Sequence, residues 1–311
     1  MMMIPEINLN TGNSRTKYIW VVILALFGLL GLATETPAQN TSEEKVDQIL
    51  DSEKTLQLLP RGDLYKPYIA DPHRVNFSAQ LLGMVHDDID SAGDFRIGIK
   101  VGGRFGVLRL HPENRPELGW QVSFEAGLDG QFDIENSQDN IGWDGNFGWY
   151  LTNATEKGWS YKLAALHTSS HIGDEFIEDT GRKRINYTRR EIALGMSKQF
   201  TLYYRAYAEL GLGYSPGNED LQEPGRLQAG LEFEHPQSVW DNLLGWYAAL
   251  DLSSMQERDW KVDIAFQTGV FLPMQERMHR VGIEVYRGRP PLGEFFQDTE
   301  MQITFGIWVD I

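Results

Sequence analysis

The sequence predicts an all-β protein, an antiparallel transmembrane β-barrel of about twelve strands. From Val75 onward, apolar and polar residues alternate with a period of two in one run after another. Many runs reach the roughly 9–11 residues with which a tilted strand crosses a bilayer. No long helical pattern interrupts them. The barrel is therefore expected over residues 75–311, after an export signal and a short polar leader.

The N-terminus has the layout of a secretory signal peptide. The first 17 residues are polar, and the apolar run YIWVVILALFGLLGL follows at Tyr18–Leu32. This run is shorter than the roughly 20 apolar residues of a membrane-spanning helix. Small residues come next, at Thr36 and Ala38. We expect a signal peptide over 1–38 that is cleaved after Ala38; an uncleaved membrane anchor is the alternative.

A polar leader is expected over residues 39–74, on the periplasmic side. Thr41 and Glu44 have the spacing of a capping box for a short amphipathic helix. The following stretch LLPRGDLYKPYIADPHR, residues 58–74, contains three prolines. It should therefore be extended or turn-like, because proline disrupts helices.

The alternating runs give the expected strands. The last one is the clearest: Ile303, Phe305 and Ile307 point to one face, while Thr304 and Gly306 point to the other. The predicted strands lie near 75–86, 94–110, 119–132, 142–152, 157–168, 185–198, 202–214, 225–235, 244–255, 260–271, 278–287 and 300–311.

A soluble β-sandwich is the alternative architecture, because its strands alternate as well. Its strands are shorter, however, and its polar face carries more Lys and Glu. Here the polar positions are rich in Gly, Asp, Gln, Ser and Arg, which suits a hydrated lumen. Tryptophan and tyrosine also stand near the ends of many runs, as in the aromatic belts of membrane proteins. Inward-facing Arg96, Lys100, Arg205, Glu209 and Asp263 are expected to form a charge network in the lumen.

Composition excludes several functions. The chain of 311 residues has no cysteine, which removes disulfides, thiol catalysis and thiolate metal sites. The net charge of −16 argues against a nucleic-acid partner, since phosphates would be repelled. An exported protein of the bacterial outer membrane fits both observations.

The stretch LHTSSHIGDE at residues 166–175 holds the candidate site. With both termini in the periplasm, the connection after the fifth strand is extracellular. His167 and Ser169 then lie at the outer rim. They share the parity of the lipid-facing residues Tyr161 and Leu163, and Asn186 shares the lipid-facing parity of the next strand. Polar groups on that wall suggest a lipid or lipopolysaccharide partner.

A His-x-Ser pair at a strand end, with a polar partner on the next strand, resembles outer-membrane phospholipase A and the barrel lipid A deacylases. The resemblance covers about twenty residues. It implies that Ser169 is the nucleophile, that His167 is the base, and that Asn186 orients the imidazole. It also implies calcium, with Asp174 and Glu175 as candidate ligands. Those families have Asn after the serine, where this chain has Ser170.

A second resemblance is broader. The stretches PYIADP, from residue 67, and HTSSHIGDE, from residue 167, resemble those of a family of uncharacterised bacterial outer-membrane proteins. This resemblance implies the fold and the location and names no reaction.

Two hypotheses for the function follow. The first is a lipid acyl-ester hydrolase that uses His167, Ser169 and Asn186. The second is a non-enzymatic barrel, either a narrow porin-like channel or a structural envelope protein. The substrate, the pore width and the oligomeric state do not follow from the sequence. Other interpretations of the same stretch are a polar strand end among lipid headgroups and a metal site formed by His167 with His171, Asp174 and Glu175.

Overall fold

The structure is a computed structural model, and it describes residues 54–310 except 90, 91, 137, 138, 215, 219, 241, 242, 275 and 276. The predicted signal peptide, its cleavage after Ala38 and the expected helix near Thr41 lie outside the described residues. No helix in the described part of the chain is long and apolar enough to cross a membrane.

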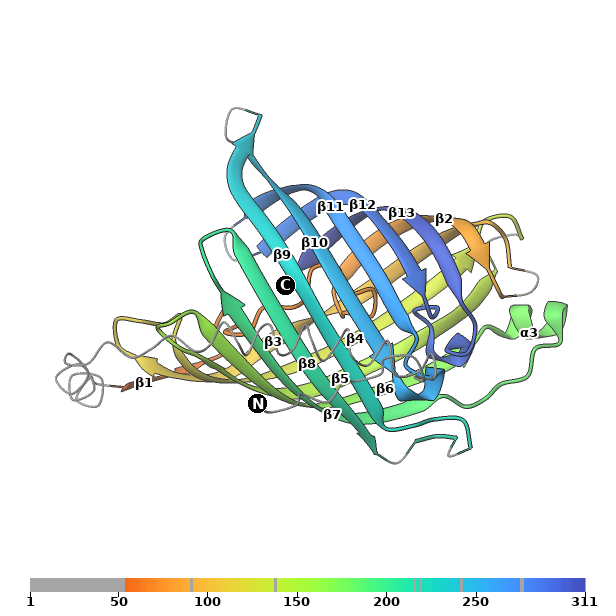
Figure 1. Cartoon of the computed structure of the whole chain (residues 1–311), viewed down its shortest axis with the longest axis horizontal. Helices are drawn as coiled ribbons and strands as arrows, with labels where there is room; N and C mark the ends of the chain where they lie inside the picture. The colour runs from red at the N-terminus through yellow and green to blue at the C-terminus, as the bar shows by residue number, and fades with distance from the viewer. Residues whose placement is uncertain are drawn as a thin grey trace, which may run out of the picture.

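The fold is all-β, with strands that tilt strongly across the molecule (Figure 1). The strands are β1 (Lys54–Leu58), β2 (Phe77–Asp87), β3 (Phe95–Pro112), β4 (Gly119–Asp133), β5 (Asn140–Ala154), β6 (Trp159–Ile172), β7 (Thr188–Gln199), β8 (Tyr204–Tyr214), β9 (Gly225–Val239), β10 (Leu244–Met255), β11 (Val262–Met274), β12 (Arg277–Gly288) and β13 (Glu300–Asp310). Three short helices join strands: α3 (Asp174–Thr180), η1 (Gln256–Arg258) and η2 (Gly293–Phe295).

Strands β2 to β13 form a closed antiparallel barrel. Each strand pairs with the next, and β13 pairs back onto β2 with Val309 opposite Phe77. Closure leaves none of these strands as a free edge along its whole length, which protects a long sheet from aggregation. β1 is a thirteenth strand outside the ring, and it pairs with the far end of β3.

The alternation predicted from the sequence separates the two faces of the wall. On β13, Ile303, Phe305 and Ile307 are about half exposed on the outer surface, whereas Gln302 and Thr304 are buried in the lumen. Outward apolar residues occur on every strand of the ring, which forms the surface that a bilayer requires.

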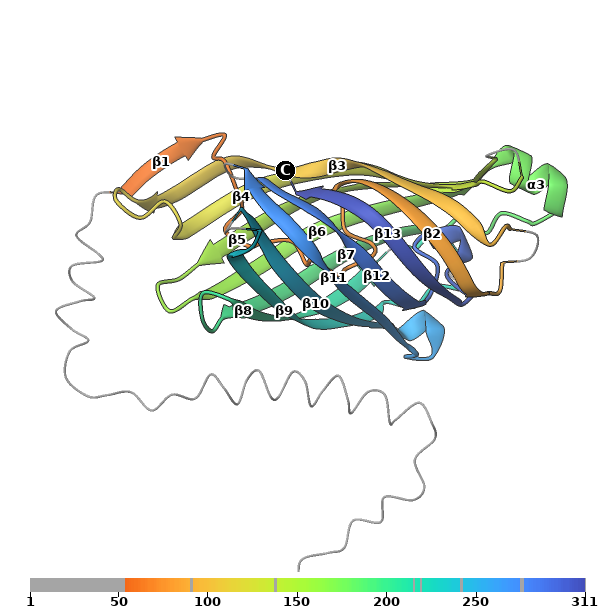
Figure 2. The ribbon, with the colours of Figure 1, turned by 90° about the horizontal axis from the view of Figure 1, so that it is seen from above.

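All twelve predicted barrel strands are confirmed, each with small shifts at its ends. Two elements were not expected. β1 carries only five residues, too few for a clear period, and the stretch after Ile172 forms the helix α3 instead of an open loop. The short turns and β1 lie at one end of the barrel, and α3 lies at the opposite end (Figures 1 and 2). We name these the turn end and the loop end.

Residues 59–76, here named the lumen segment, pass through the inside of the barrel. β1 and β2 both run antiparallel to β3: Leu58 lies opposite Leu108, and Ser78 lies opposite Lys100. Between these two pairings the chain leaves the edge of β3 and enters the lumen. The segment is extended and turn-like, as its prolines predict. Most of this segment falls within residues 39–74, for which the sequence predicted a polar leader.

Candidate functional site

The lumen is lined by charged side chains that are almost completely buried. The predicted network of Arg96, Lys100, Arg205, Glu209 and Asp263 is confirmed as inward-facing, since each of these residues is buried. Buried charges are expensive unless they are paired and hydrogen-bonded, so this lining has to be neutralised within the barrel.

Basic side chains of β3 are neutralised by the acidic side chains that lie directly opposite them on β4. Lys100 lies opposite Asp129, and Arg104 lies opposite Glu125. The Lys100 Nζ to Asp129 Oδ2 distance is 2.6 Å, and Arg104 Nη2 lies 2.9 Å from Glu125 Oε2. Because side chains at every second position share a face, basic residues four apart form a row along the lumen side of β3.

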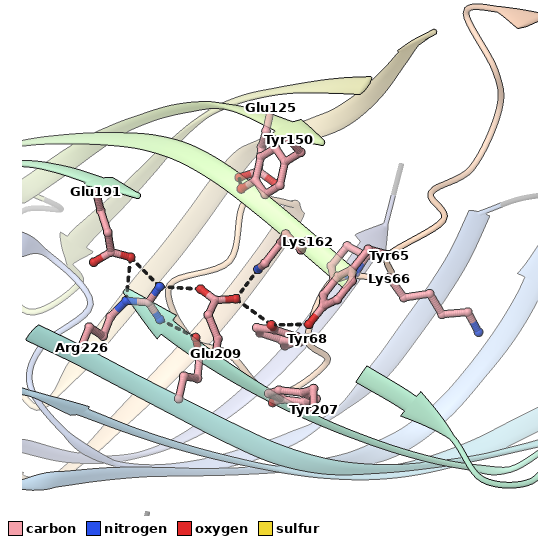
Figure 3. Close-up of polar contacts among 12 residues, drawn as sticks. Tyr65, Lys66, Tyr68, Glu125, Tyr150, Lys162, Glu191, Tyr207, Glu209 and Arg226 are labelled. Carbon is pink, nitrogen blue, oxygen red and sulfur yellow. Dashed lines mark hydrogen bonds and ion pairs between the residues drawn. The ribbon is translucent and has the colours of Figure 1, made fainter. Parts of the chain in front are cut away.

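A second network centres on Glu209 of β8 (Figure 3). The Glu209 carboxylate pairs with Lys162 of β6 and lies 2.5 Å from Arg226 Nη2 of β9. Arg226 Nη2 also lies 2.5 Å from Glu191 Oε1 of β7. Four neighbouring strands are therefore joined along the lumen wall by one continuous set of ion pairs.

The lumen segment inserts two tyrosines into this network (Figure 3). Tyr68 Oη donates a hydrogen bond to Glu209 Oε2 at 2.6 Å and lies 2.8 Å from Tyr65 Oη. Lys162 Nζ lies 4.7 Å from the centre of the Tyr68 ring. Burial raises the pKa of Tyr65 and of Tyr68 well above the usual range, so both phenols keep their protons and remain donors.

A cavity of about 160 Å³ lies in the lumen. The lumen segment lines one side of it with Tyr65 and Tyr68, and the connection between β12 and β13 lines another side with Arg289 and Gly293. Its remaining lining includes charged wall residues of both signs. The lumen is thus divided into a filled part around the segment and a small polar chamber.

The connection between β12 and β13, residues 289–299 and here named the loop lid, closes the loop end. Leu292 and Phe295 are buried against Ile172 and Phe176 in an apolar cluster. The Glu294 carboxylate accepts hydrogen bonds from the backbone N–H groups of Ile185 and Tyr187, at 2.8 and 2.9 Å. The lid is consequently fixed both by apolar packing and by charge-assisted hydrogen bonds.

Ser170, which stands where the lipase families have Asn, takes part in fixing this lid. Its hydroxyl donates to the Asp144 carboxylate and accepts the Glu294 backbone N–H at 2.8 Å. The Gly293 backbone N–H donates to Asp144 Oδ2 at 3.0 Å. The inward Ser170 is therefore committed to docking of the loop lid, while the other inward polar residue, Thr168, donates to Asn146 Oδ1 of β5.

His167 and Ser169 lie on the outer surface of β6, near its loop end. The inward Lys162, Ala164 and Ser170 are buried, and the two candidate residues have the opposite parity. The His167 ring stacks on Phe147 of β5 with the ring centres 4.5 Å apart. Among the described residues, no hydrogen bond joins the His167 ring to the Ser169 hydroxyl or to the Asn186 amide.

Asn186 does not lie beside His167. β7 begins at Thr188, and the register places Arg190 opposite His167 and Thr188 opposite Ser169. Asn186 precedes the strand and has a left-handed backbone with φ of 57°. Alternation tells which face of a strand a residue lies on, but not which residue of the next strand lies opposite. The connection between β6 and β7 contains helix α3, and it sets the register so that Arg190, not Asn186, lies opposite His167.

Asp174 and Glu175 form the first turn of α3 and are exposed. The Asp174 carboxylate lies 2.7 Å from Arg184 Nη2. Calcium takes about six to eight oxygen ligands, and two adjacent surface carboxylates, one of them paired with arginine, do not fit that requirement. The described residues contain no group of three or more metal-ligating side chains.

The functional residues that sequence reasoning missed are Tyr65, Tyr68, Lys162 and Arg226. The tyrosines lie in a stretch assigned to the leader, and nothing in the sequence pairs that stretch with β8. The only available signal was the combination of tyrosines and prolines in LYKPYIADP, which is unusual for a solvated linker.

Comparison with solved structures gives the same barrel architecture. The outer membrane phospholipase of Salmonella typhi, solved as a dimer with bound calcium, matches with a TM-score of 0.53 and 9% identity, over 79% of this chain and 93% of that one. The outer membrane phospholipase A of Escherichia coli gives 0.51 and 10%, over 77% and 93%. At such identities the likeness establishes the fold alone.

The NanC porin is also similar, with a TM-score of 0.42 and 13% identity over 76% of this chain and 99% of that one. No curated protein matches the chain in sequence. One family profile does match, over residues 31–309, and its description is "Protein of unknown function (DUF1207)". Because that match covers most of the sequence, the chain belongs to the DUF1207 family, whose fold is here an outer-membrane type of β-barrel.

Proposed function

We propose that the protein is a non-enzymatic barrel of the bacterial outer membrane, a narrow channel for small polar solutes that its own lumen segment closes. The observation that carries the proposal is the position of residues 59–76 inside a charged lumen. The segment spans the interior, because Arg104 of β3 and Arg205 of β8, on nearly opposite walls, both donate to its backbone.

The chemistry of the wall supports a channel. A barrel that served only as a scaffold could fill its interior with apolar side chains, whereas this wall keeps buried charges of both signs along its length. Such a lining is stable when water or a polar solute enters. The lumen segment is held by polar contacts, which water can replace when the segment leaves, and by the packing of Ile69 and Ala70 in an apolar cluster with Tyr247.

The register of the strands suggests a variant without the segment. Leu58 lies opposite Leu108, and Phe77 would lie opposite Val101. Because Val107 is a bulge that has no partner on β4, the stretch 102–107 of β3 needs five partners. Replacing residues 59–76 by five alternating strand-forming residues would join β1 and β2 into one strand and keep Leu58 and Phe77 on the same outer face. This bridge variant should keep the ring closed and empty the lumen.

The test compares single-channel currents of the wild type and the bridge variant in planar bilayers. We expect stable open-channel currents for the bridge variant and a closed wild type. A matched control replaces residues 113–118, the turn between β3 and β4, by six glycine and serine residues; it should stay closed. Equally closed wild-type and folded bridge barrels, with folding checked by heat-modifiable migration, would refute the channel.

A lipid acyl-ester hydrolase is the second candidate, and the lipid-facing position of Ser169 favours it. Ser169 lies between His167 and His171 on the same outer face of β6, and Gly145 opposite leaves its hydroxyl uncovered on that side. The substrate would be an acyl ester of an outer-membrane lipid or lipopolysaccharide. Against this candidate stand the position of Asn186 and the stacking of His167 on Phe147.

The test measures fatty-acid release from phospholipid micelles with and without calcium. Wild type should release fatty acid, and Ser169→Ala should not. Ser160→Ala is the matched control, because Ser160 lies on the same strand near the turn end and bonds to Ser197. Equal release by wild type and Ser169→Ala would exclude the serine as the nucleophile.

A further inference from the structure

The wall holds the lumen segment through its main chain. Arg109 Nη2 donates to the carbonyl oxygens of Arg61 and Gly62 at 3.1 and 2.7 Å. Arg104 Nη1 donates to that of Tyr65 at 3.2 Å. Carbonyl oxygens are common to every peptide, so these contacts do not depend on the side chains of the segment.

Further hydrogen bonds continue this pattern. Arg205 donates to the carbonyl oxygens of Lys66 and Pro67 at 2.6 and 3.1 Å, and Lys100 donates to that of Pro72. In the opposite sense, the backbone N–H of Ile69 donates to Glu232 Oε1 at 2.8 Å. The wall thus offers donors to peptide carbonyls and an acceptor to a peptide N–H.

Three of these four basic side chains are already neutralised by acids. Lys100 pairs with Asp129, Arg104 with Glu125, and Arg205 with Glu232 at 2.8 Å. Each cation thereby uses part of its donor set on a carboxylate and part on a carbonyl. A polyanion would need unpaired positive charge, whereas this lining is nearly neutral and suits the dipoles of a peptide backbone.

The segment itself shows which conformation fits. Its prolines, at positions 60, 67 and 72, have no N–H that would need a partner, and their fixed φ favours an extended chain. The Tyr68 ring stacks on Tyr207 of β8 with ring centres 3.7 Å apart and planes 7° apart. Tyr68, which directly follows Pro67, therefore contacts the wall through the full face of its ring.

We propose that the lumen, once the segment has left it, binds extended oligopeptides, and that such peptides are the solute class of the channel. This inference rests on the proposed function. Because most hydrogen bonds between the wall and the segment end on the main chain of the segment, peptides of similar length with proline and one aromatic residue should bind whatever their remaining sequence. Binding should be lost mainly when wall donors are removed.

The experiment adds peptides to the bridge variant. The probes are a synthetic peptide with the sequence of residues 64–72, LYKPYIADP, an unrelated peptide of the same length with proline and tyrosine at the same positions, and a sulfated oligosaccharide of similar length. Both peptides should block the open current, and the oligosaccharide should not. Replacing Arg104 and Arg205 by methionine should weaken the block by about tenfold or more.

The outcomes separate the two proposals. An open bridge variant that the peptides leave unblocked, or that only the oligosaccharide blocks, overturns the peptide inference and leaves the channel standing. A folded bridge variant without current overturns the channel. In that case the anisotropy of a fluorescent LYKPYIADP peptide decides separately whether the emptied lumen binds peptides.

If the bridge variant does not fold, a full-length Ile69→Pro variant replaces it. That change removes the N–H that Glu232 accepts and weakens docking of the segment. The fluorescent peptide should bind to this variant at least several-fold more tightly than to the wild type. Equal binding to both would contradict the inference.

Discussion

At the scale of single residues, Tyr68 joins the lumen segment to the barrel wall. Its phenol donates to the ionised Glu209, which is already held by Lys162 and Arg226. Hydrogen bonds to a charged partner contribute about 1.5–3 kcal/mol, more than neutral ones. The loss of this hydrogen bond should therefore loosen the segment.

Tyr68→Phe should expose the segment to solvent more often, because the ring stays while the hydrogen bonds of its hydroxyl to Glu209 and to Tyr65 are lost. Since the chain has no cysteine, Ala70→Cys places one thiol at a fully buried position of the segment. Labelling of this thiol by a hydrophilic maleimide should be about tenfold faster in Tyr68→Phe. Tyr214→Phe, on the exposed outer surface, is the control, and a rate equal to that control would contradict the prediction.

At the scale of elements, the loop lid is positioned by neighbours on two strands and by the connection that precedes β7. Asp144 of β5 and Ser170 of β6 bind its backbone, and Glu294 binds the two N–H groups just before β7. The lid and the connection 181–187 therefore stabilise each other, although they are far apart in the sequence. Removing the charge of Glu294 should release both.

Glu294→Gln should make the connection 181–187 sensitive to protease. The two N–H groups bind different oxygens of the carboxylate, and the amide replaces one of these oxygens by an NH2 group, which cannot accept. The connection carries Arg182, Lys183 and Arg184, which trypsin recognises. Trypsin should cut this connection several-fold faster in the variant than in wild type. Glu178→Gln changes an exposed carboxylate of α3 and serves as the control; similar cleavage of all three proteins would show that Glu294 does not fix the loop.

At the scale of the whole molecule, the apolar outer surface demands a membrane and the polar lumen demands water or polar partners. Leu163 on β6 illustrates the first requirement, since it is 44% exposed on the outer face next to inward Lys162. A soluble protein would turn such residues inward. The closed ring, with its outer apolar surface, therefore determines the environment of the barrel.

Leu163→Arg should destabilise the barrel in lipid vesicles by about 2–4 kcal/mol, which is the cost of an arginine near the bilayer midplane. Leu202→Arg is the matched control, because Leu202 lies in the turn between β7 and β8 and is 87% exposed. Denaturant unfolding of both variants in the same vesicles measures the difference. Equal stability of the two would argue that β6 does not face lipid.

Much of the fold could be predicted from residue patterns. Alternation in β13 assigned Ile303 outward and Thr304 inward, and the structure agrees, because the side-chain period of a strand is a local property. The inward charges at Arg96 and Lys100 followed from the same rule. The candidate site was harder, since the pairing of Asn186 with a residue on β6 depends on a long connection whose geometry the sequence does not reveal.

The sequence by itself determined which side chains face lipid and which face the lumen, because a strand alternates wherever it is placed. Only the tertiary structure decided that Arg190 lies opposite His167, since register depends on how the chain between β6 and β7 folds. It also decided that residues 59–76 lie inside the barrel. Their partners on β3 and β8 are distant in sequence, and such contacts form only when the ring closes.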